Sequence, residues 1–245
     1  MIRLDAATVM LQWSAGGLGF LWFTTRRGVA GPGYGLLLRA TFAAFAAISV
    51  LLGARYGVVP LREASGVAVV VAALATLRAR RPSLDLIAPA LAVPGLVAAA
   101  AAAADGAGGT AVSIARVLVG TAFLGAVSDA MLLGHWYLVQ PGMPRRLLNE
   151  MTTAVIVTWP FEVAVLLLPT GMVSVLNGTV DDGWDGVLGW FWLASAVLTG
   201  VLAFVTRAAL RERSYAAVMA ATGLMYLAIL TAFCTDIVAR ALLAG

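Results

Sequence analysis

Long apolar segments fill most of this chain, and its charged residues gather in short clusters roughly 20–30 residues apart. A helix that crosses about 30 Å of hydrocarbon needs roughly 20 apolar residues. The pattern therefore predicts an all-α, polytopic integral membrane protein with about eight transmembrane helices. The expected spans are residues 6–25, 34–54, 58–77, 84–104, 110–139, 148–169, 186–206 and 215–241.

The third expected span, residues 58–77, has the least apolar start, because Arg62 and Glu63 interrupt it. We expect both side chains to lie at the membrane interface, where water or lipid head groups solvate them. The alternation of basic loops depends on this span, since its loss would reverse the side of every later loop.

Composition excludes a soluble fold. Of the 245 residues, 62% are hydrophobic and only 11% are charged, whereas soluble domains carry roughly 25% charged residues. The apolar segments extend along the whole chain, so we expect one transmembrane domain over residues 1–245 and no separate soluble domain. The first segment lacks a clear cleavage site and is interpreted as a span rather than a removable signal.

Basic residues indicate the orientation in the membrane. Ten of the 16 arginines lie in alternate loops, namely Arg26, Arg27, Arg78, Arg80, Arg81, Arg145, Arg146, Arg207, Arg211 and Arg213. Two of the other loops are acidic, one at Asp105 and one at 181–185. Because arginine collects on the cytoplasmic side, both termini are expected on the non-cytoplasmic side. Together with a composition typical of a GC-rich bacterial genome, this predicts a multi-pass protein of the bacterial cytoplasmic membrane.

Aromatic residues agree with this orientation. Tyr34 and Trp136 fall near the expected cytoplasmic interface, and Trp184 and Trp192 fall near the opposite one. Amphipathic rings favour both interfaces of a membrane.

The two halves of the chain, residues 1–107 and 108–245, resemble each other loosely. A basic or glycine-proline loop precedes residues 36–41 in the first half and 147–152 in the second. This alignment places Arg39 opposite Glu150. Since four spans would separate the copies, they would share one orientation, as in a parallel four-plus-four repeat.

Ionisable residues inside spans are costly and are default candidates for a site. Counting from the turn near Met143 places His135 and Glu150 at similar depth on adjacent helices, and Arg39 shares that level. This set could bind a polar head group or relay protons, and histidine suits proton transfer near neutral pH. The alternative is that His135 lies at the interface and that Arg39 extends to the lipid head groups.

Glu162 and Asp129 are further candidates for proton relay or ligand binding. Glu162 lies near the middle of its span beside Pro160, and an acid beside a broken helix is one way to build a proton or ion site. Alternatively, Glu162 is a neutral, hydrogen-bonded acid that holds helices together. Asp129 and His135 lie about 240° apart around their helix, so we do not expect them to form a pair.

Three charged residues near the non-cytoplasmic side have expected structural roles. Arg116 and Asp236 lie at a depth where they could pair, and Asp236 and Arg240 are four residues apart, as in an ordinary intrahelical pair. The glycines at 16, 17 and 19 predict close helix packing, because no strand precedes them to form a phosphate loop.

Residue counts exclude several chemistries. The chain has no lysine, so no retinal Schiff base can form, and its single cysteine, Cys234, permits no internal disulfide and no iron–sulfur cluster. One histidine cannot supply the paired ligands of haem or a zinc hydrolase site, so we expect no haem and no metal. The arginines lie between apolar segments, which favours a membrane surface over nucleic acid as the partner.

Three functions stay open. The first is a haem-free membrane subunit of a respiratory or electron-transfer complex, which would bind a quinone, relay protons and assemble with other subunits. In helix count and repeat, the expected architecture is similar in outline to the haem-free, eight-helix quinol subunits of polysulfide-reductase-type enzymes. The second is a small transporter or channel that uses Glu162. The third is a non-catalytic scaffold subunit; no residue is assigned as catalytic.

Overall fold

A computed structural model describes residues 4–104 and 109–243. This part of the chain is helical and contains no strand. The helices are α1 (Ala6–Thr25), α2 (Pro32–Tyr56), α3 (Pro60–Ala75), the 3₁₀ helix η1 (Pro82–Leu86), α4 (Ile87–Ala102), α5 (Gly109–Val139), α6 (Arg146–Leu167), α7 (Gly171–Leu176), α8 (Val187–Ala209) and α9 (Tyr215–Leu243). The prediction of an all-helical fold is therefore confirmed.

Six segments of the described chain are long and apolar enough to cross a membrane: α2, η1 with α4, α5, α6, α8 and α9. Each of the eight expected spans overlaps one long helix, but α1 and α3 are outside this set of six. α1 contains 20 residues and α3 contains 16. The helices thus fit a multi-pass membrane protein.

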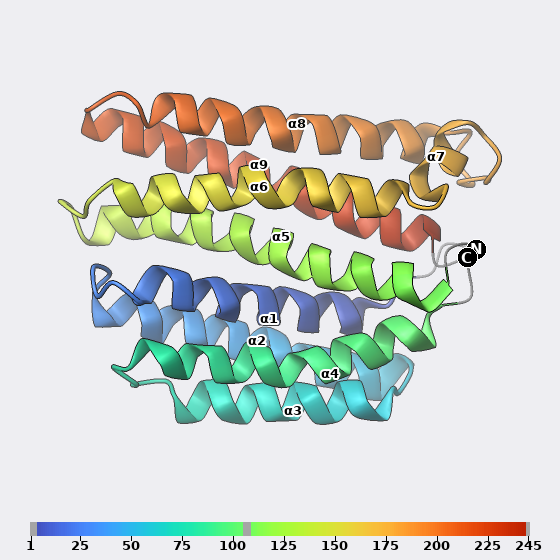
Figure 1. The fold of residues 1–245 in the computed structure, drawn as a ribbon, viewed down its shortest axis with the longest axis horizontal. Helices are drawn as coiled ribbons and strands as arrows, with labels where there is room; N and C mark the ends of the chain where they lie inside the picture. The colour runs from blue at the N-terminus through green and yellow to red at the C-terminus, as the bar shows by residue number, and fades with distance from the viewer. Residues whose placement is uncertain (1–3, 105–108, 244–245) are drawn as a thin grey trace.

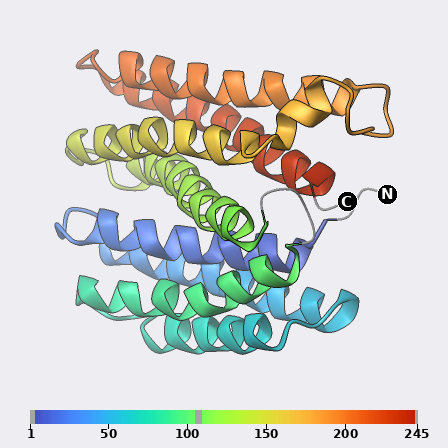
Figure 2. The same cartoon turned by 45° about the vertical axis from the view of Figure 1, so that its right-hand side comes forward.

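The long helices form two groups of four that lie side by side (Figures 1 and 2). In the first group, α1 and α3 each pack against both α2 and α4. In the second group, α5 and α8 each pack against both α6 and α9. The order of packing is therefore the same in both groups, and α5 joins them by packing against α1 and α4.

Glycines allow the close contact between the two groups. The backbones of α1 and α5 meet at Gly16 and Gly125, where a Cβ atom on Gly16 would lie 3.0 Å from the Gly125 Cα and closer still to the Thr121 carbonyl oxygen. A Cβ on the adjacent Gly17 would overlap the ring of Phe42. Small residues let helices approach in lipid, where packing takes the place of the hydrophobic effect. We call the Gly16–Gly125 contact the seam.

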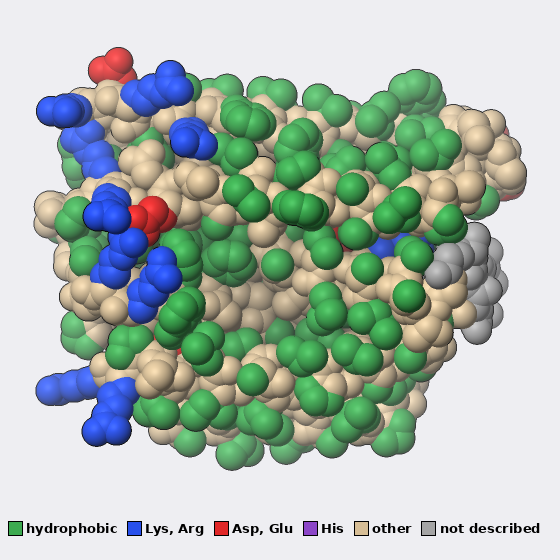
Figure 3. All heavy atoms as spheres, in the orientation of Figure 1, with side chains coloured by type: hydrophobic (Ala, Val, Ile, Leu, Met, Phe, Trp, Pro, Cys, Tyr) green, Lys and Arg blue, Asp and Glu red, His purple; other side chains and the backbone are tan. Residues whose placement is uncertain are grey.

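The basic loops lie together at one end of the molecule. The connections α1–α2, α3–η1, α5–α6 and α8–α9 all lie there, while α1 begins and α9 ends at the opposite end (Figure 1). Arginine side chains gather at this same end in the space-filling view (Figure 3). We call it the arginine-rich end. The acidic loop at Asp105 lies outside the described residues.

Three side chains that were expected at membrane interfaces are buried in the protein. Arg62 is only 2% exposed, because its Nη1 binds both carboxylate oxygens of Asp5 at 2.9 and 2.7 Å and its Nη2 binds Glu63 at 2.6 Å. The protein, not solvent, thus neutralises its charge. Tyr34 and Trp192, both expected at membrane interfaces, are buried between helices.

Candidate functional site

The structure does not gather His135, Glu150 and Arg39 into one site. Arg39 is buried, and its Nε donates to the Asp85 carboxylate at 2.8 Å while its Nη1 donates to the Leu77 carbonyl. The expectation that Arg39 extends to the lipid head groups is therefore wrong. Sequence analysis missed Asp85. It could have been found by searching for a carboxylate at the depth of Arg39, because an arginine inside the membrane needs a counter-charge.

Glu150 and His135 have separate partners near the arginine-rich end. Glu150 accepts from Arg27 at 2.5 Å and from Arg146 at 2.9 Å. His135 is exposed on α5, and its Nδ1 lies 3.1 Å from the Tyr226 hydroxyl of α9. Asp129 on the same helix is fully buried, and its carboxyl group makes no hydrogen bond to His135.

A buried polar cluster lies where α1, α5, α6 and α9 meet. The expected Asp236–Arg240 pair forms, and the Arg240 Nε donates to both carboxylate oxygens at 2.8 Å. A Cβ on Gly120 of α5 would lie 2.5 Å from the Gln12 Nε2, 2.7 Å from the Asp236 Oδ1 and 2.8 Å from the Arg240 Nη2. The three side chains therefore converge on the space that this glycine leaves. With Glu162 they form what we call the interface cluster.

Glu162 is the carboxyl group of this cluster that lacks a hydrogen bond. Its side chain is fully buried, and neither oxygen has a partner in the described part of the chain. Asp236 and Arg240 are its charged neighbours, and the Asp236 carboxylate could accept a hydrogen bond from the protonated form of Glu162. α6 is not broken beside it, because the helix continues through Pro160.

Gln12 was missed by sequence analysis. Both its amide oxygen and its amide nitrogen are buried without a partner in the described chain. Gln12 could have been noticed in the sequence as an isolated amide side chain in an apolar helix. It extends the polar cluster from the second group of helices to α1 of the first.

Arg116 does not pair with Asp236 as expected. Its Nε donates to the Val165 carbonyl at 3.2 Å, and its Nη2 donates to the Leu168 carbonyl. Its own carbonyl accepts from Arg240 at 3.0 Å. Arg116 thus connects the interface cluster to the end of α6, and its guanidinium charge has no carboxylate partner among the described residues.

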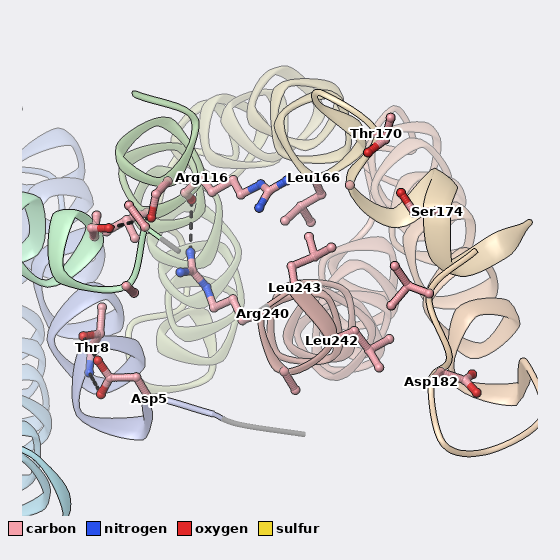
Figure 4. Close-up of a pocket in the computed structure, with 18 of the residues that line it drawn as sticks. Asp5, Thr8, Arg116, Leu166, Thr170, Ser174, Asp182, Arg240, Leu242 and Leu243 are labelled. Carbon is pink, nitrogen blue, oxygen red and sulfur yellow. Dashed lines mark hydrogen bonds between the residues drawn. The ribbon is translucent and has the colours of Figure 1, made fainter. Parts of the chain in front are cut away.

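A cavity of about 760 Å³ lies at the end of the molecule opposite the arginine-rich end, and it adjoins the interface cluster at Arg240. Both groups of helices line it, since α1 and α4 contribute to one side and α5, α6, α7 and α9 to the other. Arg116 and Arg240 lie side by side in its wall, whereas Asp5 and Asp182 lie farther apart at its edges (Figure 4).

The carboxylates that line this cavity are already engaged. Asp5 binds Arg62, and the Asp181 carboxylate accepts from the Gly183 N–H at 2.8 Å. Asp182 accepts from the backbone N–H groups of residues 184, 186, 188 and 189, which fixes the start of α8. Burial alone would raise the pKa of Asp182, but these four donors outweigh it and hold that pKa below its usual value.

Asp129 forms a second buried polar site, nearer the arginine-rich end. It is fully buried and has no hydrogen-bond partner among the described residues. The hydroxyl of Tyr34 on α2 is likewise buried without a hydrogen-bond partner in the described chain, and Asp129 is an ionisable neighbour of it. Tyr34 was not singled out by sequence analysis because it was interpreted as an interfacial residue.

In the described part of the chain, no three His, Cys, Asp or Glu side chains come together as a metal site would require. Comparison with known proteins adds no assignment, since no family model, no curated protein and no solved structure matches this chain. The function of this protein must therefore be inferred from the geometry of its cavity and of its buried carboxyl groups.

Proposed function

We propose that the protein is a proton-coupled membrane carrier, in which the cavity binds a small solute and the interface cluster exchanges a proton. The observation that carries this proposal is a cavity between two helix groups with a buried, unpartnered carboxyl group beneath it. Secondary transporters bind substrates near the interface of two repeated halves, and buried acids there serve as proton carriers.

The volume and charge of the cavity favour a small anionic solute. About 760 Å³ lies within the range of about 300–1,000 Å³ that small-molecule sites occupy. The carboxylates of its wall are engaged by Arg62 and by backbone N–H groups, whereas Arg116 donates only to carbonyl oxygens in the described chain. A solute with a carboxylate or phosphate group would supply the missing counter-charge.

The proposed orientation follows from the arginine-rich end. We propose that all eight long helices cross the bacterial cytoplasmic membrane, with α1 and α3 included, and that both termini lie outside the cytoplasm. The two groups of helices would then be the copies of a parallel four-plus-four repeat. Their identical packing order supports this, because α1, α2, α3 and α4 correspond to α5, α6, α8 and α9. The cavity would face the non-cytoplasmic side.

The proposed carrier function is tested by comparing proton flux in the wild type and in Glu162→Gln. The purified protein is reconstituted into liposomes that contain a pH-sensitive dye, and a panel of small carboxylates and phosphates is added outside. We expect at least one solute to produce proton flux in the wild type and Glu162→Gln to lose at least about tenfold of it, as expected for loss of a proton carrier. Glu150→Gln, the same change on the same helix at an exposed site, should retain the flux.

Two results would contradict the carrier. One is a wild-type protein that moves no proton with any solute in the panel, which would favour the scaffold function. The other is unchanged flux in Glu162→Gln. Labelling of cysteines introduced at residues 79 and 212 tests the orientation, since both should react only from the cytoplasmic side.

The His135–Tyr226 pair favours a second candidate function, that of a quinone-binding subunit. The His135 Nδ1 and the Tyr226 hydroxyl lie 3.1 Å apart on two exposed helix surfaces, and one member of this hydrogen-bonded pair could donate to a quinone carbonyl from the lipid. Such a subunit would act with redox partners in a respiratory complex. Purification from native membranes tests this, because it requires bound quinone that is lost in His135→Leu, together with comigrating redox subunits.

A further inference from the structure

Asp129 and the interface cluster lie at different heights along α5. Asp129 lies nine residues after Gly120 on a continuous helix, or roughly 13 Å along its axis. Gly125 and the seam lie between the two positions. The two buried carboxyl sites, Asp129 and the interface cluster, therefore lie on opposite sides of the seam.

No polar side chain near Asp129 donates a hydrogen bond to it in the described chain. The neighbouring Ser128 hydroxyl accepts from the Trp13 indole at 2.6 Å, and the Thr24 hydroxyl beside Tyr34 donates to the Leu21 carbonyl at 2.9 Å. The Tyr34 hydroxyl has no partner in the described chain, and its ring packs against Trp136 of α5 with ring centroids 5.7 Å apart. Its O–H is thus a candidate donor to Asp129 on the same helix.

Cations cannot neutralise Asp129 in this arrangement. Arg39 is bound to Asp85, and Arg27 is bound to Glu150. His135 lies on the exposed side of the same helix, with Tyr226. An ionised carboxylate that is buried without donors or a counter-ion would lose hydration worth many kcal/mol, so this closed arrangement holds Asp129 as the neutral acid.

We infer that Asp129 is a second proton-binding site, with Tyr34 as its hydrogen-bonding partner, and that it exchanges protons with the arginine-rich side when the seam opens. The proton leaves one Asp129 oxygen for water when α1 moves from α5, and water returns it before the helices close. This inference rests on the proposed carrier for its role in transport, but proton binding at Asp129 stands on its own geometry.

Infrared spectroscopy tests proton binding without any solute. Protonated carboxyl groups absorb separately from carboxylates, so spectra of the full-length protein in lipid are compared between the wild type and Asp129→Asn. We expect one protonated-carboxyl band to disappear in Asp129→Asn and to persist in Asp182→Asn. In Tyr34→Phe the same band should stay and shift to higher frequency if the phenol donates to the acid. An unchanged set of bands in Asp129→Asn overturns the inference.

Proton flux in liposomes then tests the role in transport. We expect Asp129→Asn to lower the flux at least about tenfold and Tyr34→Phe to lower it less, because Tyr34 positions the proton rather than carrying it. Normal flux in Asp129→Asn overturns the relay role. Wild-type protein without flux would instead reject the carrier, and the infrared band would still decide whether Asp129 holds a proton. Should Asp129→Asn fail to fold, Tyr34→Phe tests proton binding instead: a protonated-carboxyl band that shifts to higher frequency supports the inference, and bands that do not shift overturn it.

Discussion

The two groups of helices treat buried charge in opposite ways. In the first group, the buried guanidinium groups of Arg39 and Arg62 each have a carboxylate within 2.8 Å. In the second group, Glu162 and Asp129 are buried without any hydrogen-bond partner in the described chain. Groups with the same packing order thus differ in what their polar residues can do. The described ion pairs neutralise both buried arginines of the first group, whereas the second group combines the Asp236–Arg240 pair with two carboxyl groups that have no hydrogen-bond partner in the described chain.

The seam should give the largest effect on stability, because backbone atoms of the two groups meet there directly. Gly16→Ala places a methyl group against the Thr121 carbonyl and Gly125, so the helices must separate. We expect the loss to exceed both the roughly 1–3 kcal/mol of ordinary overpacking and the roughly 3–5 kcal/mol of a broken buried ion pair. Gly19→Ala is the matched control, since its Cβ would meet nothing nearer than Pro89 at 3.9 Å. Chemical unfolding in detergent measures both, and equal stability of the two variants would contradict the seam.

Breaking the buried pair of the first group should come next. Asp85→Ala leaves the Arg39 guanidinium without a counter-charge, which costs about 3–5 kcal/mol at a buried site. Glu150→Ala removes an exposed pair with Arg27 and Arg146 and should cost less than about 1 kcal/mol. The double variant Arg39→Met with Asp85→Leu should regain most of the loss. Comparable losses for Asp85→Ala and Glu150→Ala would remove the distinction.

A smaller effect on stability should distinguish Asp236 from Glu162, the two carboxyl groups of the interface cluster. Asp236→Asn weakens two charge-assisted bonds from Arg240 and should cost about 1.5–3 kcal/mol. Glu162→Gln supplies an amide that can donate to the neighbouring Asp236, as the protonated acid can, so its unfolding temperature should stay close to that of the wild type. Thermal unfolding in detergent checks both, and a large loss in Glu162→Gln would favour the structural role of that acid.

The smallest effect concerns the loop before α8 and depends on pH. The pKa of Asp182 is depressed in the folded protein, so its carboxylate stabilises the fold above the unfolded pKa of about 3.9. This contribution declines as the pH falls through the folded pKa. We expect Asp182→Asn to be less stable than the wild type at neutral pH, and the difference to vanish in acid. Asp181→Asn changes a carboxylate that accepts from a single backbone N–H, so it should lose less stability at neutral pH than Asp182→Asn.

Sequence patterns predicted the elements of this fold better than its contacts. Each expected span overlaps a long helix, because apolar length and basic loops are local signals. The pair Asp236–Arg240 was equally predictable, since four residues on one helix bring the side chains together. Helix positions and local pairs therefore follow from spacing alone.

Contacts between distant helices could not be predicted in the same way. Depth counting put Arg39 near His135 and Glu150, but depth leaves the direction around each helix open. Arg39 faces Asp85, 46 residues away, and Arg62 faces Asp5, 57 residues away. The interface cluster likewise needs Gly120, whose role is visible only when three other helices meet around it.

The arginine-rich end has a consequence for how this protein responds to its surroundings. A guanidinium group keeps its proton at every physiological pH, and the chain contains no lysine. The positive charge of the arginine side chains at this end is therefore constant in mild acid and in mild alkali, and no lysine is present there to lose its charge by acetylation.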